Sequence, residues 1–177
     1  MLTEQPTAPL TAAEQDIVCQ RVAHEIDRAA RWLGMALPAI EVRFDLSGTS
    51  AGMYCHRGER RWLRFNPWLF AKDLPLHLHD TVIHEVAHYA INIRHGRRRL
   101  QPHGAEWQAL MVALGADPKA TFQADMTGIP VRRQRRYGYV CRCREHELSA
   151  TRHNRIVRRR AVYRCSYCHG KLTRSAD

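Results

Sequence analysis

The amino-acid sequence predicts an α+β protein with one main domain and a small cysteine-rich module at its C-terminal end. Two long segments have apolar residues at helical spacing, and short segments between them alternate apolar and polar residues as strands do. The last part of the chain contains two close pairs of cysteines, Cys141 with Cys143 and Cys165 with Cys168. Together these observations predict helices packed on a small antiparallel sheet, followed by a separate module.

Size and composition agree with this division. The chain has 177 residues, 45% of them hydrophobic, which is enough for one proper core and a small second module. No apolar run approaches the roughly 20 residues that a membrane-spanning helix needs. Residues 1–10 have neither the basic nor the apolar region of a signal peptide. We therefore predict a cytoplasmic protein without a membrane partner.

The first predicted helix begins at a capping box. Thr11 supplies the N-cap and Glu14 stands three residues later. Gly34 is expected to end the helix, because glycine adopts the left-handed conformation that closes many helices. One face of this helix is apolar and should be buried; it consists of Val18, Val22, Ile26, Ala29 and Leu33.

Three short strands are expected after this helix. Residues 40–46 alternate strictly between apolar and polar side chains, which predicts a half-buried strand. Residues 53–55 and 61–66 flank a turn at 56–59 and predict a hairpin. The pair Asn66-Pro67 should end the third strand, because proline lacks the backbone N–H that a sheet requires.

A second long helix is predicted over 74–95, with Asp73 as its cap and Gly96 at its end. A shorter helix is expected over 105–114, closed by Gly115. We place the main domain at residues 10–125, a basic linker at 126–136 and the cysteine-rich module at 137–173.

The second long helix contains the motif His84-Glu85-Val86-Ala87-His88. Two histidines four residues apart share one helical face and are separated by only about 6 Å of rise, so both imidazoles can bind one metal ion. Glu85 can then reach a water molecule at that metal and act as a general base. This is the arrangement of the zincin metalloproteases, so the sequence predicts a zincin-like domain that binds Zn²⁺.

A catalytic zinc usually has three protein ligands and one open position. Two residues after the motif are candidates for the third ligand, His103 and Glu106. The metzincin spacing is excluded, because Ile91 and Arg94 stand where that pattern requires glycine and histidine.

The four cysteines of the C-terminal module predict a structural zinc site, which would stabilise a module too small for its own core. Cys165 and Cys168 have the usual spacing of a zinc knuckle, whereas Cys141 and Cys143 are one residue closer together. His146 is therefore an alternative fourth ligand.

The net charge of +11 lies entirely in the module and the linker before it. Residues 131–177 hold 14 basic and 3 acidic side chains, while the acidic and basic residues of 1–130 cancel. Arginines interleaved with tyrosines predict binding to single-stranded nucleic acid, with phosphates paired to guanidinium groups and bases stacked on aromatic rings. The candidate contacts are Arg132, Arg133, Arg135, Arg136, Arg155, Arg158, Arg159 and Arg160.

Several further segments resemble the SprT family of zincin metalloproteases, and the resemblance covers most of residues 15–172. They are the HEVAHY motif, the His-Gly-x-Glu-Trp segment at 103–107, Leu-Met-x-x-Leu-Gly at 110–115, Ala-Gly-x-Tyr at 51–54, Leu-Arg-Phe-Asn-Pro at 63–67 and the cysteine-rich tail. The resemblance implies that His103 is the third ligand. It does not decide between Cys141 and His146 in the second site.

The resemblance also implies a function. In eukaryotic members of the family the protease digests proteins crosslinked to DNA. We therefore expect a zinc endopeptidase that acts on DNA-bound proteins, with single-stranded or damaged DNA as partner and possible association with the nucleoid. Tyr54, Tyr89 and the segment 97–99 are candidates to stabilise the oxyanion. The alternative is a nucleic-acid-binding zinc protein whose His84–His88 site is vestigial or not proteolytic.

Overall fold

The computed structural model describes residues 8–96, 101–118, 125–129 and 135–175. Contacts divide the chain into two units, Met1–Val131 and Arg132–Asp177, each with helices and strands. The mixed α+β class is therefore confirmed. The division falls inside the segment 126–136 that we predicted as a linker, but Ile129 of this segment packs against Ala51 and Leu69 of the first unit.

Helix α1 (Ala12–Leu33) begins and ends where the sequence predicts. The Thr11 hydroxyl accepts a hydrogen bond from the Glu14 N–H at 3.3 Å, and the Thr11 N–H donates to the Glu14 carboxylate at 2.8 Å. Gly34 ends the helix in the left-handed conformation, with φ 66°. The five predicted apolar residues are buried, together with Glu25, which is paired with Arg21 and Arg28 at 2.8 Å each.

The first sheet contains β1 (Glu41–Arg43), β2 (Gly52–Arg57) and β3 (Arg60–Phe65) in the order β1-β3-β2. The hairpin of β2 and β3 is confirmed. The prediction of an antiparallel sheet is wrong, because β1 pairs with β3 in parallel. The chain reverses direction between β1 and β2 and again between β2 and β3. A first strand placed beside the third therefore runs parallel to it.

The predicted helix over 74–95 is two helices, α3 (Leu74–His79) and α4 (Thr81–His95), which meet at Asp80. The apolar periodicity continues across this junction and therefore does not reveal it. At the junction the Thr81 hydroxyl bonds with Nδ1 of the buried His77 ring at 2.8 Å. The predicted cap at Asp73 and the predicted end at Gly96 are both confirmed.

Helix α2 (Pro67–Lys72) was not predicted. Its N-cap is Asn66, whose side-chain oxygen accepts from the backbone N–H groups of Trp68 and Leu69. Asparagine followed by proline at the first helical position is a recognised signal for the start of a helix. From the sequence, this pair predicted only the end of the third strand.

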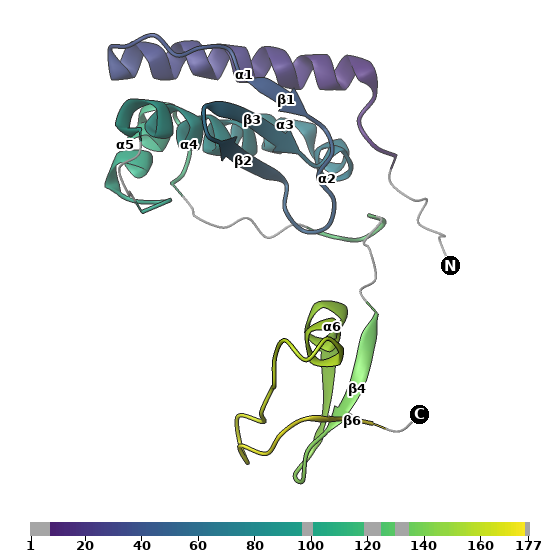
Figure 1. Ribbon diagram of the computed structural model, residues 1–177. Helices are drawn as coiled ribbons and strands as arrows, with labels where there is room; N and C mark the ends of the chain where they lie inside the picture. The colour runs from purple at the N-terminus through teal and green to yellow at the C-terminus, as the bar shows by residue number, and fades with distance from the viewer. Residues whose placement is uncertain (1–7, 97–100, 119–124, 130–134, 176–177) are drawn as a thin grey trace. The chain divides into compact units, whose positions relative to one another are not determined.

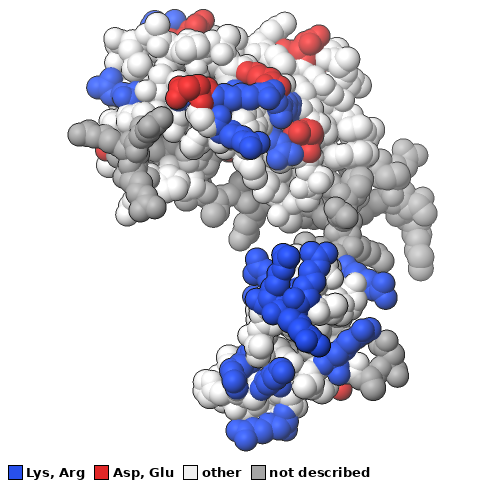
Figure 2. Space-filling model, in the orientation of Figure 1, with Lys and Arg blue, Asp and Glu red and all other residues white. Residues whose placement is uncertain are grey.

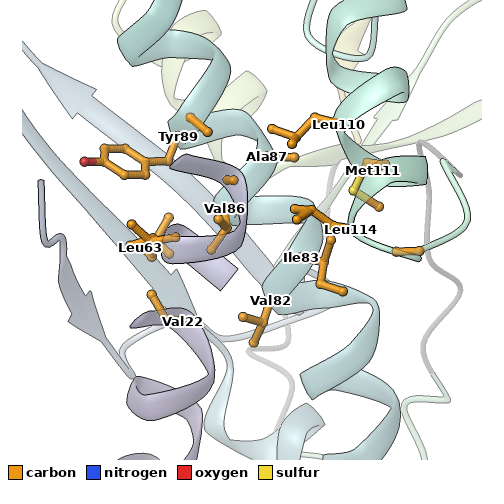
Figure 3. Close-up of a cluster of buried hydrophobic side chains, with 14 of the residues drawn as sticks. Val22, Leu63, Val82, Ile83, Val86, Ala87, Tyr89, Leu110, Met111 and Leu114 are labelled. Carbon is orange, nitrogen blue, oxygen red and sulfur yellow. The ribbon is translucent and has the colours of Figure 1, made fainter. Parts of the chain in front are cut away.

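Helix α5 (Ala105–Ala113) completes the first unit and agrees with its predicted range to within one residue. Figure 1 shows α1 along one side of the unit, with the sheet beside it and α4 next to α5. Apolar side chains from α1, β3, α4 and α5 meet in one core (Figure 3), with α4 contributing the most. The labelled members are Val22, Leu63, Val82, Ile83, Val86, Ala87, Tyr89, Leu110, Met111 and Leu114.

The second unit contains β4 (Arg136–Val140), β5 (Glu145–Ser149), helix α6 (Ala150–Val157) and the short β6 (Thr173–Arg174). Its sheet is antiparallel throughout, in the order β5-β4-β6. Among the described residues of this unit, the buried apolar cluster consists of Tyr139, Leu148, Cys165 and Leu172. A core of this size is too small to stabilise a domain without further cross-links.

In the part of the chain that the structure describes, no helix has both the length and the hydrophobicity that crossing a membrane requires.

The capping box of α1 gives a first testable prediction. Thr11→Ala should lower the free energy of unfolding by about 1 kcal/mol, because it leaves the Glu14 N–H without its acceptor. Urea unfolding followed by circular dichroism measures this change. Thr11→Ser keeps the hydroxyl and should retain most of the stability. Equal losses in both variants would contradict the role of the cap.

Candidate active site and metal centres

Three histidine side chains converge between α4 and α5. His84 and His88 lie one turn apart on α4, and His103 lies just before the first residue of α5. Their Nε2 atoms are 3.1 Å (His84 to His88), 3.1 Å (His88 to His103) and 3.2 Å (His84 to His103) apart. In a tetrahedral zinc site with the usual Zn–N bond length, ligand nitrogens are about 3.3 to 3.4 Å apart. The donor set therefore fits a zinc ion.

The protonation of these histidines also suits a metal. Burial, together with the neighbouring histidines, lowers the pKa of His84 to about 4 and that of His88 to about 3. Both rings are therefore neutral at pH 7, and a neutral imidazole is the form that binds metal ions.

The Trp107 ring contacts all three imidazole rings. Its ring centroid lies 4.7 Å from that of His84, 5.5 Å from that of His88 and 4.6 Å from that of His103. The indole N–H points to the carbonyl oxygen of His84 at 3.4 Å, and Trp107 is only 1% exposed. Although it belongs to the His-Gly-x-Glu-Trp segment, sequence reasoning assigned it no role.

Of the two candidates for the third ligand, the structure brings His103 to the pair on α4. Among the described residues the cluster consists of His84, His88 and His103. Glu106 lies on the exposed side of α5 and is not part of the cluster.

Glu85 lies beside the histidines and is only 6% exposed. Its Oε2 accepts a hydrogen bond of 2.6 Å from the backbone N–H of Tyr54 in β2. Burial raises the pKa of its carboxyl group to about 7, against the opposing effect of this hydrogen bond. A carboxyl group with this pKa can both accept and donate a proton near neutral pH.

Glycine at position 52 makes room for the Glu85 side chain. A Cβ atom there would lie 2.7 Å from Glu85 Cγ and 2.9 Å from Glu85 Oε1, closer than non-bonded atoms approach. It would also lie 2.7 Å from the Thr81 methyl carbon. The close approach of β2 to α4 therefore depends on Gly52.

The structure describes two of the three candidates for oxyanion stabilisation, and both are tyrosines whose hydroxyls are already hydrogen-bonded. Tyr89 is buried, and its hydroxyl donates to the carbonyl oxygen of Pro38 at 2.6 Å. The Tyr54 hydroxyl donates to Asn92 Oδ1 at 2.8 Å. A tyrosine hydroxyl has one proton to donate, so neither group has a free donor in this structure. The segment 97–99 lies outside the described residues.

The second cluster contains all four cysteines of the module. The Sγ atoms are 3.4 Å (Cys141 to Cys143), 3.7 Å (Cys143 to Cys165) and 3.6 Å (Cys141 to Cys168) apart. A tetrahedral zinc–thiolate site has sulfur–sulfur distances of about 3.8 Å. His146 Nε2 lies 3.3 Å from Cys141 Sγ, but His146 is not in the cluster.

Backbone N–H groups stabilise the thiolate form of the second cysteine pair. Those of Cys168 and Tyr167 lower the pKa of Cys165 to about 7, and that of Gly170 lowers the pKa of Cys168 to about 6. Neighbouring thiols, chiefly that of Cys141, raise the pKa of Cys143 to about 12. Because thiolates are the form that binds metals, this backbone arrangement favours a zinc ion.

The predicted nucleic-acid contacts are exposed wherever the structure describes them. Arg132 and Arg133 lie outside the described residues. Basic side chains gather on the second unit with few acidic ones among them (Figure 2). The exposed arginines from our predicted set are Arg135, Arg136, Arg155, Arg158, Arg159 and Arg160.

The tyrosines of the second unit are not all available for stacking on bases. Tyr139 is 1% exposed, and its hydroxyl bonds with His153. The ring of Tyr137 stacks on that of His153 at 3.7 Å. Tyr167 is 71% exposed and holds the Arg144 guanidinium over its ring at 3.6 Å. The alternation of arginine and tyrosine in the sequence therefore overstated the accessible aromatic surface.

The chain is similar to known proteins over nearly its whole length. The model of the SprT-like family matches residues 19–134. Protein SprT of Escherichia fergusonii is 34% identical over 168 residues, which cover 94% of this chain and 98% of that protein. Protein SprT of Escherichia coli O157:H7 and of Shigella boydii serotype 18 are each 34% identical over 167 residues, or 94% of this chain and 97% of theirs. No solved structure matches the chain significantly.

The two clusters predict how zinc content responds to substitution. The purified protein should contain two zinc equivalents per chain by elemental analysis after dialysis. His103→Ala should remove the one held by the histidines, because two imidazoles alone bind zinc weakly. Glu106→Gln, three residues along the chain, should leave both equivalents in place. Loss of zinc from Glu106→Gln instead of His103→Ala would contradict the ligand set.

The raised pKa of Glu85 predicts a pH-dependent stability of the metal-free protein. An unfolded glutamate titrates near pH 4.3, so the folded state binds the proton more tightly. This contribution is complete below that pH and is lost as the pH rises through about 7. Glu85→Gln stays neutral throughout. It should therefore be more stable than the wild type at pH 8, by about 3 kcal/mol.

Urea unfolding of both metal-free proteins at pH 8 and at pH 4.5 tests this prediction. The difference should nearly vanish at the lower pH. A difference that grows toward acid pH would contradict it.

Proposed function

Because this chain belongs to the SprT-like family, we propose that it is a zinc-dependent endopeptidase with a zincin-like catalytic domain. One observation carries the proposal. Three imidazole nitrogens lie within 3.2 Å of one another, and the carboxylate of Glu85 follows the first of these histidines on the same helix. Family membership alone suggests only a metalloprotease-like role.

Each side chain of the site has a definite task in peptide hydrolysis. His84, His88 and His103 would hold the zinc ion, which would supply Lewis acidity toward a water molecule and a carbonyl group. Glu85 removes a proton from the attacking water and delivers it to the leaving amine. The Tyr54 N–H orients the Glu85 carboxylate for both transfers.

The position of the sheet favours a peptide as the substrate. Among the described strands β2 pairs only with β3, and the Tyr54 N–H on its other edge donates to Glu85. Extended peptides bind to exposed sheet edges through backbone hydrogen bonds. A substrate lying along β2 would bring a backbone carbonyl to Glu85. A metal-dependent hydrolase of small molecules has no need of such an edge.

The second unit is the proposed DNA-binding part, and DNA-bound proteins are the proposed substrates. The net charge of +11 lies in residues 131–177, which supports binding to phosphates. The arginines of this unit that the structure describes are exposed, as contacts with phosphates require. DNA bound there would raise the local concentration of proteins attached to the same strand.

Cleavage assays test this proposal. The zinc-loaded protein should cleave a basic DNA-binding protein, and single-stranded DNA should accelerate the cleavage. Glu85→Gln should lower the rate at least about a hundredfold, because it cannot accept the proton. A variant with four arginines of the second unit replaced by glutamine should lose the acceleration by DNA; they are Arg155, Arg158, Arg159 and Arg160.

Two other outcomes would redirect the proposal. Tight DNA binding without cleavage by the wild type would favour a nucleic-acid-binding protein with a non-proteolytic metal site. Cleavage that DNA does not affect would retain the protease and remove the DNA-dependent part of the proposal.

A further inference from the structure

Tyr54 connects strand β2 to helix α4 at two points. Its backbone N–H donates to Glu85 Oε2 at 2.6 Å, and its hydroxyl donates to Asn92 Oδ1 at 2.8 Å. Asn92 follows Glu85 by seven residues, which is about two helical turns and places both side chains on one face of α4. One residue of the strand therefore contacts the helix over about 10 Å of its length.

Asn92 receives a second hydrogen bond from the neighbouring strand. Arg61 of β3 donates from Nε to Asn92 Oδ1 at 3.1 Å, and its Nη1 donates to the carbonyl oxygen of Glu59 at 2.9 Å. An amide oxygen has two lone pairs, so Tyr54 and Arg61 together use both. The Asn92 side chain thus joins both strands of the hairpin to α4.

The position of Glu85 depends on this connection. Among the described strands β2 pairs only with β3, and α4 contacts its other edge through Glu85. Gly52 and the Tyr54 N–H both contact the Glu85 side chain, and both belong to β2. A shift of β2 along α4 would move the hydrogen-bond donor away from the carboxylate and disturb the close approach to Glu85 that Gly52 allows.

We infer that Asn92 is a positioning residue, which holds the backbone of Tyr54 against Glu85 by binding the side chain of Tyr54. This inference rests on the proposed function for its catalytic consequence but not for the structural one. Asn92 contacts Tyr54 through the side-chain hydroxyl and not through the backbone N–H that binds Glu85. Its effect on the reaction passes entirely through β2.

The chemistry of Asn92 supplies a matched pair of variants. Asn92→Leu has a similar size but offers no acceptor, so the hydrogen bonds from Tyr54 and Arg61 are both lost. Asn92→Asp keeps an acceptor oxygen for both donors and gains attraction to the Arg61 guanidinium. Tyr54→Phe removes only the hydroxyl and keeps both the ring packing and the backbone N–H. It provides a second test if Asn92→Leu folds poorly.

Steady-state kinetics give the first readout. Asn92→Leu and Tyr54→Phe should lower kcat by about tenfold to a hundredfold, because small displacements of a catalytic group have effects of this size. Zinc content should remain at the wild-type level, because none of the metal ligands is altered. Asn92→Asp should restore most of kcat.

Amide hydrogen exchange of the metal-free protein gives a readout that does not depend on activity. The Tyr54 amide should exchange at least about tenfold faster in Asn92→Leu, since its hydrogen bond to Glu85 is released. The Cys55 amide is the internal control. Backbone N–H groups alternate sides along a strand, so the Cys55 N–H points to β3 and should exchange at the wild-type rate.

The two readouts separate this inference from the proposed function. An inactive wild type would defeat the proposed function, while faster exchange at Tyr54 alone would still support the positioning role. The inference is overturned if the Tyr54 amide exchanges at the wild-type rate in both Asn92→Leu and Tyr54→Phe. It is also overturned if Asn92→Asp is as impaired in kcat as Asn92→Leu.

Discussion

Helix α4 packs an apolar face into the core and presents the histidines of the candidate site on another face, and the arrangement of the first unit follows from this division. One face of the helix is apolar and lies at the centre of the core, where Val82, Val86 and Ala90 are fully buried. The other face carries His84 and His88, whose nitrogens have to remain accessible to a metal ion. The helical repeat separates these faces without any change in backbone. The helix can therefore be fixed by packing on one side and hold a reactive group on the other.

Burial of the polar face shifts the pKa values of His84, Glu85 and His88, and it requires compensating contacts. Removing Glu85 from water raises its pKa toward neutrality, and the Tyr54 N–H supplies the hydrogen bond that a buried carboxylate needs. Trp107 excludes water from one side of the histidines and binds the His84 carbonyl. These contacts come from β2 and α5, so the site exists only when both are packed on α4.

The two candidate metal-binding clusters lie in units that differ in the size of their apolar cores. In the first unit the apolar core is large enough to fold the chain, and the histidines add chemistry to an existing scaffold. In the second unit few apolar side chains are buried, and the four cysteines that could hold a metal ion lie within 4.8 Å of one another. Basic side chains cover much of the face of the second unit that Figure 2 shows.

Local signals in the sequence determined the features that depend on neighbouring residues. The capping box at Thr11, the left-handed Gly34, the β2–β3 hairpin and the pairing of His84 with His88 each involve residues a few positions apart. Such features follow from backbone geometry and short-range hydrogen bonds alone. The choice of His103 over Glu106 needed the resemblance to a family, because spacing left both open.

Tertiary structure alone decided which distant segments meet. Periodicity indicates that a face is buried but not what covers it, so the sequence did not reveal that β1 pairs with β3 in parallel. For the same reason it did not show that Tyr139 lies in the core of the second unit. The contacts of Asn92 with Tyr54 and Arg61 join residues more than 30 positions apart. Hydrogen bonds of this kind depend on the packing of whole elements, which no local pattern encodes.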